Sequence, residues 1–449
     1  MSQMIATSNV KAVIGTGITG LSVARFLAAK QQAFVLLDTR TNPPNLEKIR
    51  QEFPGVTIEC GELQSETLLA CAEIIVSPGV SVATPAIEQA KNSGIPVVGD
   101  IELFVRYAKA PIVAITGSNA KSTVTTLVGE MARAAGIKVA VGGNLGTPAL
   151  ELLDDAIELY VMELSSFQLE TVTKLNAKVA TILNISADHL DRYDSMRAYI
   201  LAKLRIYFGA ERIVVNRNDV LTHPPLAAGV KPTYFGGNAD FGGFGLIKEN
   251  NEEYLAKNLT PLMLARELKI RGRHNVDNAL AALALGDGAG IPMNAMLDAL
   301  RSFKGLKHRC EFVAEKNGVE FYNDSKGTNI GATLAAVNGL ARDPHQLIVI
   351  LGGEGKGQDF TELAPALKAI NAHVVLIGRD APLIEQALQQ VTTITHAVSL
   401  QDAVNKSFAI ANNGDAVLLS PACASFDMFK NYEDRGEKFC AAVQELIAS

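Results

Sequence analysis

Short runs of apolar residues recur along the chain, and each is followed by a glycine-containing turn and a segment with helical periodicity. The runs most typical of buried strands cover residues 10–14, 34–37, 74–76, 112–115, 160–162, 181–185, 347–351, 374–377 and 416–419. Strands that are apolar throughout, without polar alternation, are typical of parallel sheets covered by helices on both faces. The pattern therefore predicts an α/β fold with mainly parallel sheets.

The chain has 449 residues, which at about 150 residues per domain indicates roughly three domains. Interruptions of the pattern near residues 99 and 305 divide the chain into three predicted domains, 1–99, 100–305 and 306–449. We expect Rossmann-like first and third domains. Residues 235–245, rich in Gly and Phe, are expected to form an irregular excursion within the middle domain.

Composition and charge narrow the classes of function. The 41 basic and 47 acidic side chains give a net charge of -6, which argues against nucleic acid as a partner. No apolar stretch approaches the ~20 residues that span a bilayer, and the polar N-terminus lacks a secretory pattern. The five cysteines are scattered, so disulfides and zinc sites are poorly supported. We expect a cytoplasmic protein without a membrane partner.

The first motif is a glycine-rich turn, Gly15-Thr16-Gly17-Ile18-Thr19-Gly20, between a predicted strand and a predicted helix. The next strand ends at Asp38. Glycines in this context let backbone N–H groups approach a pyrophosphate at a helix N-terminus. A nucleotide or sugar-nucleotide site is the favoured interpretation, and a purely structural tight turn is the alternative.

The second motif lies between strand 112–115 and a helix predicted over 124–135: Thr116-Gly117-Ser118-Asn119-Ala120-Lys121-Ser122-Thr123. Lys121 at a helix N-terminus suits the β- and γ-phosphates of a nucleotide, and the Ser122 hydroxyl suits Mg²⁺. A polar helix cap is the alternative. The motif departs from the general P-loop because Ala120 replaces the usual glycine before the lysine.

Further polar residues follow other predicted strands. Glu163 ends one strand, where a carboxylate can meet Mg²⁺, and His189 follows another, where it suits a metal or phosphate. Lys203, on a helix predicted over 196–207, reads by itself as a solvated surface lysine. Asn275 and Asn278 share one helix face, and either read a purine edge or cap the helix. The chain's third part adds three polar loops at the same sheet edge, which suit a dicarboxylate or phosphate: residues 323–329, 352–356 and 420–427.

Taken together, the motifs resemble the Mur ligase family over essentially the whole chain. Seven of them occur in order: GSNAKST, MELSSFQLE, ADHLDRY, GRHNVDNALAALAL, LKHRCEF, NDSKGTN and LLSPACASFDMFKNYEDRG. The LSSFQLE stretch and the C-terminal block favour the branch that adds D-glutamate.

The resemblance implies an ATP-dependent ligase of three domains that joins D-glutamate to UDP-N-acetylmuramoyl-L-alanine through an acyl phosphate in cytoplasmic peptidoglycan precursor synthesis. The first domain would bind the UDP substrate and the central P-loop-type domain ATP and Mg²⁺. The third domain would bind the amino acid and close over ATP. We expect a monomer whose partners are these small molecules. The residues implied for the UDP substrate are Gly17, Ile18, Thr19, Asp38, Thr39, Arg40, Ser77, Gly79, Asn144, Ser165 and Gln168.

The same resemblance implies the remaining site residues. Those for ATP are Gly117, Ser118, Asn119, Ala120, Lys121, Ser122, Thr123, Asn278, Arg309 and Asp324. Those for D-glutamate are Lys326, Thr328, Lys356, Ser425, Phe426 and Tyr432. Two Mg²⁺ ions would be bound by Ser122, Glu163, His189 and Lys203, the last as a CO₂-derived carbamate, and the catalytic residues would be Lys121, His189 and Lys203.

Other functions remain open at this point. Within enzymes, the alternative is another ligase of the superfamily, such as a different Mur ligase or folylpolyglutamate synthase. A nicotinamide-dependent oxidoreductase would explain Gly15–Gly20 and Asp38 but leaves Lys121, Ser122 and Glu163 without a role. A nucleotide-binding regulator without chemistry is the third class.

Overall fold

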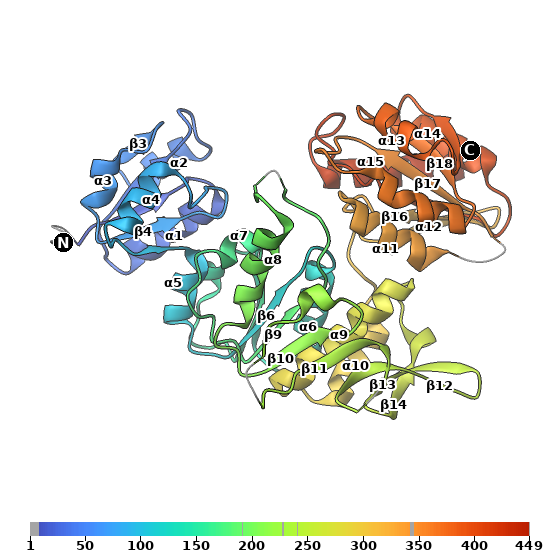
Figure 1. The fold of residues 1–449 in the computed structure, drawn as a ribbon, viewed down its shortest axis with the longest axis horizontal. Coiled ribbons are helices and arrows are strands. Elements are labelled where there is room, and N and C mark those ends of the chain that lie inside the picture. Colours follow the sequence, from blue (N-terminus) through green and yellow to red (C-terminus); the bar gives the residue numbers. More distant parts are fainter. Residues whose placement is uncertain (1–8, 191, 227–228, 240, 342–344, 449) are drawn as a thin grey trace.

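The computed structural model describes residues 9–190, 192–226, 229–239, 241–341 and 345–448. Nearly all of the N-terminal segment that we expect to lack a secretory signal lies outside these residues, as does Asp191 of the ADHLDRY motif. The chain forms three α/β units, which follow one another from blue to red in Figure 1. The predicted fold class is confirmed. The three sheets fall within the three predicted ranges, whose boundaries stay a prediction.

The N-terminal unit is a five-stranded parallel sheet in the order β3-β2-β1-β4-β5. Its strands are β1 (Lys11–Ile14), β2 (Phe34–Asp38), β3 (Ile58–Cys60), β4 (Glu73–Val76) and β5 (Val97–Val98). Its helices are α1 (Ile18–Ala29), α2 (Leu46–Glu52), α3 (Ser65–Leu69) and α4 (Pro85–Asn92). The strand order changes direction at β1, so the loop after β1 lies at a topological switch point, where α/β proteins bind ligands.

The central unit has a nine-stranded sheet in the order β14-β13-β12-β11-β10-β9-β6-β8-β7. Its strands are β6 (Ile112–Thr116), β7 (Val139–Gly143), β8 (Leu159–Glu163), β9 (Val179–Ile182), β10 (Ile213–Asn216), β11 (Thr233–Asn238), β12 (Gly243–Glu249), β13 (Glu252–Lys257) and β14 (Thr260–Leu264). Its helices are α5 (Asp100–Tyr107), α6 (Lys121–Ala134), α7 (Ser166–Leu169), α8 (Met196–Leu204), α9 (Arg273–Ala289) and α10 (Met293–Ser302).

One expectation for this unit has displaced bounds and another is wrong. The strand predicted over 181–185 is β9, which starts two residues earlier and ends three residues earlier, although the Leu183 N–H still donates to the Thr116 carbonyl at 2.9 Å. Residues 235–238 and 243–245 belong to β11 and β12 instead of an irregular excursion, and buried Phe235 and Phe244 pair across the two strands; the only irregularity among these residues is a register shift between Phe235 and Asn238.

The C-terminal unit is a six-stranded sheet in the order β15-β16-β20-β17-β18-β19, parallel except for β15 with β16. Its strands are β15 (Glu311–Lys316), β16 (Val319–Asn323), β17 (Leu347–Gly352), β18 (His373–Ile377), β19 (Thr393–His396) and β20 (Ala416–Leu419). Its helices are α11 (Ile330–Leu340), α12 (Ala364–Ala369), α13 (Ala381–Leu388), α14 (Leu400–Ile410) and α15 (Tyr432–Ala448). Short 3-10 helices complete the chain: η1 (Ala149–Leu152), η2 (Arg205–Tyr207), η3 (Val220–Thr222), η4 (Ala265–Glu267) and η5 (Phe360–Leu363).

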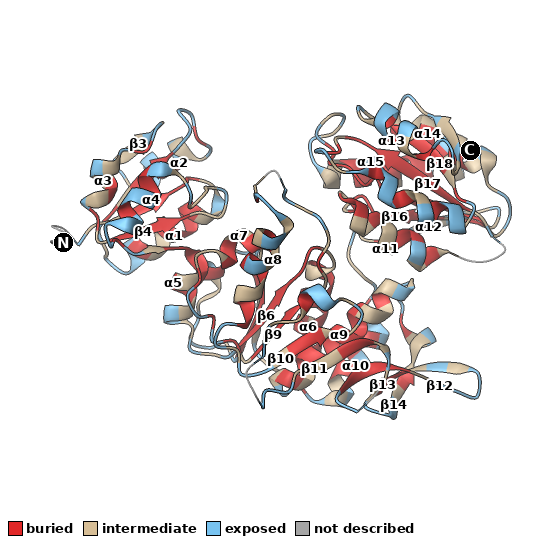
Figure 2. Cartoon of the chain, in the orientation of Figure 1, coloured by how far each residue is buried: buried red, intermediate tan, exposed pale blue. Residues whose placement is uncertain are grey.

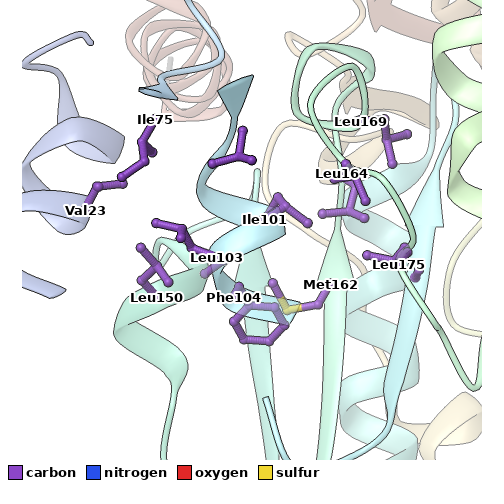
Figure 3. Close-up of a cluster of buried hydrophobic side chains, with 14 of the residues drawn as sticks. Val23, Ile75, Ile101, Leu103, Phe104, Leu150, Met162, Leu164, Leu169 and Leu175 are labelled. Atoms are coloured by element: carbon purple, nitrogen blue, oxygen red, sulfur yellow. The ribbon is translucent and has the colours of Figure 1, made fainter. Parts of the chain in front are cut away.

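Buried residues follow the sheets and the inner faces of the helices in each unit (Figure 2). One apolar cluster crosses from the N-terminal to the central unit. Figure 3 shows Ile101, Leu103 and Phe104 of α5 between Val23 and Ile75 on one side and Met162 on the other. Helix α5 therefore packs against both units. Among the described residues, no helix combines the length and apolarity needed to cross a membrane.

Candidate active site

The phosphate-loop motif connects β6 to α6, as its sequence context predicts. Lys121 is the first residue of α6, so the loop places the helix N-terminus and the lysine together. The Lys121 ammonium donates to the carbonyl oxygens of Gly117 and Ser118, both at 2.9 Å. Burial lowers the pKa of Lys121, while Glu163 and Asp188 oppose that shift. The loop holds a partly desolvated cation at the end of a buried parallel strand.

Ala120 has φ +65° and ψ -3°, which is the left-handed conformation. The absence of the usual glycine therefore has a structural cost. A non-glycine residue in this region carries strain of about 1–2 kcal/mol.

We expect Ala120→Gly to raise the free energy of unfolding by up to about 1 kcal/mol, because relief of strain exceeds the extra backbone entropy that glycine loses. Urea unfolding measures this change. Ala134→Gly, at the exposed last residue of the same helix, is the matched control and should not raise the free energy of unfolding, because no strain is relieved there. Equal losses at both positions would contradict the strain argument.

Glu163 ends β8 beside the loop and is 2% exposed. Its Oε1 accepts from the side-chain amide of Asn144 at 2.7 Å, while its Oε2 is buried without a hydrogen-bond partner. A buried, half-satisfied carboxylate that lines the same cavity as Ser122 fits a hard cation such as Mg²⁺. No cluster of three or more His, Cys, Asp or Glu side chains among the described residues forms a metal group. The donor set suits an ion that is bound largely through nucleotide phosphates.

Lys203 lies on α8 and is only 2% exposed, so its interpretation as a solvated surface lysine is wrong. Its ammonium donates to the Gly117 carbonyl at 2.9 Å and lies 4.7 Å from the centre of the Tyr199 ring. Burial, together with the charge of Lys121, lowers the pKa of Lys203 well below its ordinary value. Two lysines therefore converge on one loop carbonyl.

A cavity of about 740 Å³ joins the central and C-terminal units around this loop. From the central unit it is lined by Ser118, Asn119, Ala120, Lys121, Ser122, Asn144, Glu163, Ser165, His189 and Lys203 among others. From the C-terminal unit it is lined by Arg309, Lys326, Thr328, Lys356 and Tyr432 among others. Arg309 donates to the Ser122 hydroxyl at 2.6 Å across the two units. Residues predicted for phosphate, metal and amino acid thus share one cavity.

A second cavity of about 300 Å³ adjoins the loop. Its lining includes Asn119, Ala120, Thr123, Asn278, Arg309 and Asp324, all predicted to bind ATP. Asn278 donates to the side-chain oxygen of Asn275 at 3.0 Å, so the two amides brace one another on α9. Burial raises the pKa of Asp324 to about 7.

The loops predicted for the UDP substrate form a separate group on the N-terminal unit. Asp38 is 1% exposed and accepts from the backbone and hydroxyl of Thr16 and from the Arg40 guanidinium. Burial alone would raise the pKa of Asp38, but these hydrogen bonds outweigh it and hold the pKa well below its usual range. Ile18 is 73% exposed at the start of α1, so the turn presents an open surface beside the Ser77 loop.

Some predicted residues line neither cavity. Gln168 is buried and donates to Asp100 at 3.2 Å while capping α7 together with Ser165. Ser425 is buried and Phe426 is 65% exposed. Lys326, by contrast, lines the larger cavity, and its ammonium lies 3.8 Å from the centre of the Tyr432 ring. The roles of these residues stay predictions.

Several residues that line the larger cavity have no role predicted from the sequence. Asp188 accepts from Asn329 at 3.3 Å, and Asn329 caps α11 of the C-terminal unit. Tyr199 bonds to the Ser118 hydroxyl at 3.0 Å. Its position four residues before Lys203 on a helix was a usable signal, because such residues share one face. The phosphate-loop motif, Glu163 at the end of β8 and the converging cations have the chemistry that phosphoryl transfer requires.

Comparison with known proteins agrees with this class. Residues 9–99 match the model for the Mur ligase MurD-like N-terminal domain, 115–286 the Mur ligase middle domain, and 308–423 the Mur ligase glutamate ligase domain. The chain belongs to the Mur ligase family.

Several full-length relatives carry a common name. The UDP-N-acetylmuramoylalanine–D-glutamate ligase of Pseudomonas savastanoi pv. phaseolicola is 57% identical over 99% of both chains. That of Pseudomonas aeruginosa is 55% identical over 99% of both chains, and that of Hahella chejuensis is 50% identical over 97% of this chain and 98% of its own.

Solved structures agree on the fold. A pseudomurein peptide ligase type C from Methanothermus fervidus matches 98% of this chain and 100% of its own, with a TM-score of 0.61 at 19% identity. The UDP-N-acetylmuramate-alanine ligase of Thermotoga maritima matches 97% of this chain and 99% of its own, with a TM-score of 0.57 at 19% identity.

Proposed function

We propose that this chain is an ATP-dependent ligase that joins D-glutamate to UDP-N-acetylmuramoyl-L-alanine in cytoplasmic peptidoglycan precursor synthesis. The observation that carries the proposal is the shared cavity in which Lys121, Ser122 and Glu163 meet Arg309 and Lys326. The full-length relatives with this activity in their names support the choice of substrates.

The first step activates a carboxylate, which by itself resists nucleophiles. An oxygen of the L-alanyl carboxylate attacks the γ-phosphorus of ATP, ADP leaves, and an acyl phosphate forms. Lys121 at the N-terminus of α6 neutralises charge on the β- and γ-phosphates. Mg²⁺ supplies further neutralisation when bound, and Ser122 and Glu163 would hold it. His189 and a carbamylated Lys203 are proposed for a second ion.

The second step forms the amide. The neutral amine of D-glutamate attacks the acyl carbon, the nitrogen loses a proton, and phosphate leaves from a tetrahedral intermediate. Lys326, Thr328, Lys356 and Tyr432 line the C-terminal side of the cavity and would bind the carboxylates of D-glutamate. Ser425 and Phe426 are proposed for the same ligand. Catalysis then consists of positioning and charge neutralisation.

The remaining assignments complete the proposal. The UDP moiety binds the loops after β1, β2 and β4, with Asn144, Ser165 and Gln168 on the central side. ATP binds residues 117–123 with Asn278, Arg309 and Asp324. The domains extend over 1–99, 100–305 and 306–449, and the enzyme works as a monomer.

The test is phosphate release from ATP with each substrate omitted in turn. We expect sustained release only when UDP-N-acetylmuramoyl-L-alanine, D-glutamate and Mg²⁺ are all present. Other amino acids and folate acceptors should not replace the two substrates, and NAD(P)H absorbance should not change. Equal release with neither substrate present would reject the ligase function.

The pH dependence of D-glutamate use tests Lys326. Burial, together with the charges of Arg309 and Lys121, lowers the pKa of Lys326 to about 8. The group is cationic below that pH and neutral above it, so attraction for a carboxylate is lost as the pH rises. We expect kcat/KM for D-glutamate to fall toward pH 9, by about tenfold for each pH unit above the pKa.

Lys326→Arg is the matched control, because a guanidinium stays charged throughout this range. Deprotonation of the D-glutamate amine affects both enzymes equally, so the ratio of the two profiles isolates Lys326. Parallel profiles between pH 7 and 9 would contradict this role.

A further inference from the structure

Arg192 connects the loop at His189, here called the catalytic loop, to the N-terminal unit. Its Nη2 donates to the carbonyl oxygen of Val80 at 3.1 Å and lies 3.4 Å from a carboxylate oxygen of Glu170. The guanidinium carbon lies 4.9 Å from the centre of the Phe167 ring. The side chains of Arg192 and Glu170 are only 19% and 16% exposed. A guanidinium with three such partners has a fixed orientation.

The acceptor on the N-terminal side belongs to the loop predicted for the UDP substrate. The Val80 backbone donates to the Ser77 carbonyl at 2.9 Å, which closes a turn around Gly79. The Ser77 backbone in turn donates to the Ile14 carbonyl at 2.9 Å, at the end of β1. Arg192 therefore bonds to a turn that is fixed to the glycine-rich loop.

On the central side, the same residue is coupled to His189. The backbone N–H groups of Arg192 and Tyr193 donate to the His189 carbonyl at 2.9 and 3.1 Å, and His189 has φ +56°. The Phe167 ring under the Arg192 guanidinium also contacts the His189 ring edge-on, with 4.8 Å between ring centres. Movement of Arg192 would therefore shift both the turn of His189 and the ring that packs against it.

We propose that Arg192 is a positioning residue for the reaction: it fixes the distance between the UDP-substrate loop at Ser77–Val80 and the catalytic loop at His189. The L-alanyl carboxylate of the UDP-sugar reaches the γ-phosphate of ATP only if the N-terminal and central units keep this relative position. Displacing reacting groups by about 1 Å costs up to about 100-fold in rate. This inference rests on the proposed function, because the substrate that spans the two loops is the UDP-sugar.

The experiment compares Arg192→Met and Arg192→Lys with the wild-type chain. Methionine keeps most of the apolar stem but donates nothing, whereas lysine keeps the charge without the planar fork. We expect Arg192→Met to lower kcat/KM for UDP-N-acetylmuramoyl-L-alanine by about 10- to 100-fold, with KM for ATP and D-glutamate within about twofold. Arg192→Lys should recover part of the loss.

Arg205→Met is the matched control. Arg205 also donates to backbone carbonyls near α7, those of Leu169 at 2.8 Å and Val172 at 2.5 Å, but these contacts stay within the central unit. Arg205→Met should leave kcat/KM for the UDP-sugar unchanged. Equal effects of Arg205→Met and Arg192→Met on that constant would overturn the inference, as would a parallel rise in KM for ATP.

Calorimetric titration of each folded variant with the UDP-sugar and with ADP separates this inference from the proposed function. A wild-type chain that binds no UDP-sugar rejects both. A wild-type chain that is active, with an Arg192→Met variant of normal kcat/KM, rejects only the role of Arg192.

Discussion

Replacing Lys121 with alanine is expected to lower kcat for D-glutamate-dependent phosphate release by about 100- to 1,000-fold. Removal of one pre-organised donor from a transition state with developing charge has effects of this size. The effect should be large here because Lys121 is desolvated and adjoins the helix N-terminus. Arginine should not restore the rate, because its planar fork cannot replace a compact ammonium between the Gly117 and Ser118 carbonyls.

Lys109→Ala is the matched control for this prediction. Lys109 is 75% exposed and pairs with Asp155 at the surface, so its loss should leave the rate within about twofold. A Lys121→Ala enzyme within tenfold of wild type would show that the lysine only shapes the loop. Thermal unfolding of both variants establishes that each is folded.

Much of the fold could be predicted because central parallel strands leave a strong signal. Strands β6, β17 and β20 are buried along their whole lengths, β18 is buried after His373, and the sequences of all four are almost entirely apolar. The signal fails where a strand has one polar face. β13, which lies next to the edge strand β14, mixes exposed, intermediate and buried residues, and the glycines around the β11–β12 connection obscured the Phe235–Phe244 pair.

The candidate site could be predicted where chemistry coincides with a strand end. Lys121 follows β6, and Glu163 is the last residue of β8. Ligands of parallel sheets bind at these carboxyl ends of the strands. Arg192 could not be found in this way, because its partners Val80 and Glu170 are distant in sequence and one of them is a backbone carbonyl. Backbone acceptors have no side-chain signature. The burial of Lys203 was hidden for a related reason, since it depends on how α8 packs against the phosphate loop.

Lys203→Ala is expected to nearly abolish ligase activity, by about 1,000-fold, while leaving the fold intact. The ammonium lies in a buried site near Lys121 and the proposed ions, where a second positive charge repels both. Burial lowers the pKa of Lys203, and so favours the neutral amine that CO₂ requires. A carbamate would replace the positive charge with a negative one and supply oxygen ligands for a hard cation.

Three measurements test the modified form of Lys203. Wild-type activity should fall in CO₂-depleted buffer and return with bicarbonate, because carbamylation is reversible. Acetate should restore part of the rate of Lys203→Ala, since its carboxylate fits the space that the side chain leaves. Lys178→Ala, which removes a surface lysine paired with Glu211 at 2.6 Å but keeps Lys203, should respond to both treatments as the wild type does. If Lys203→Ala keeps near-normal activity without CO₂, the buried amine serves only to brace the Gly117 carbonyl, and the second metal position needs another ligand.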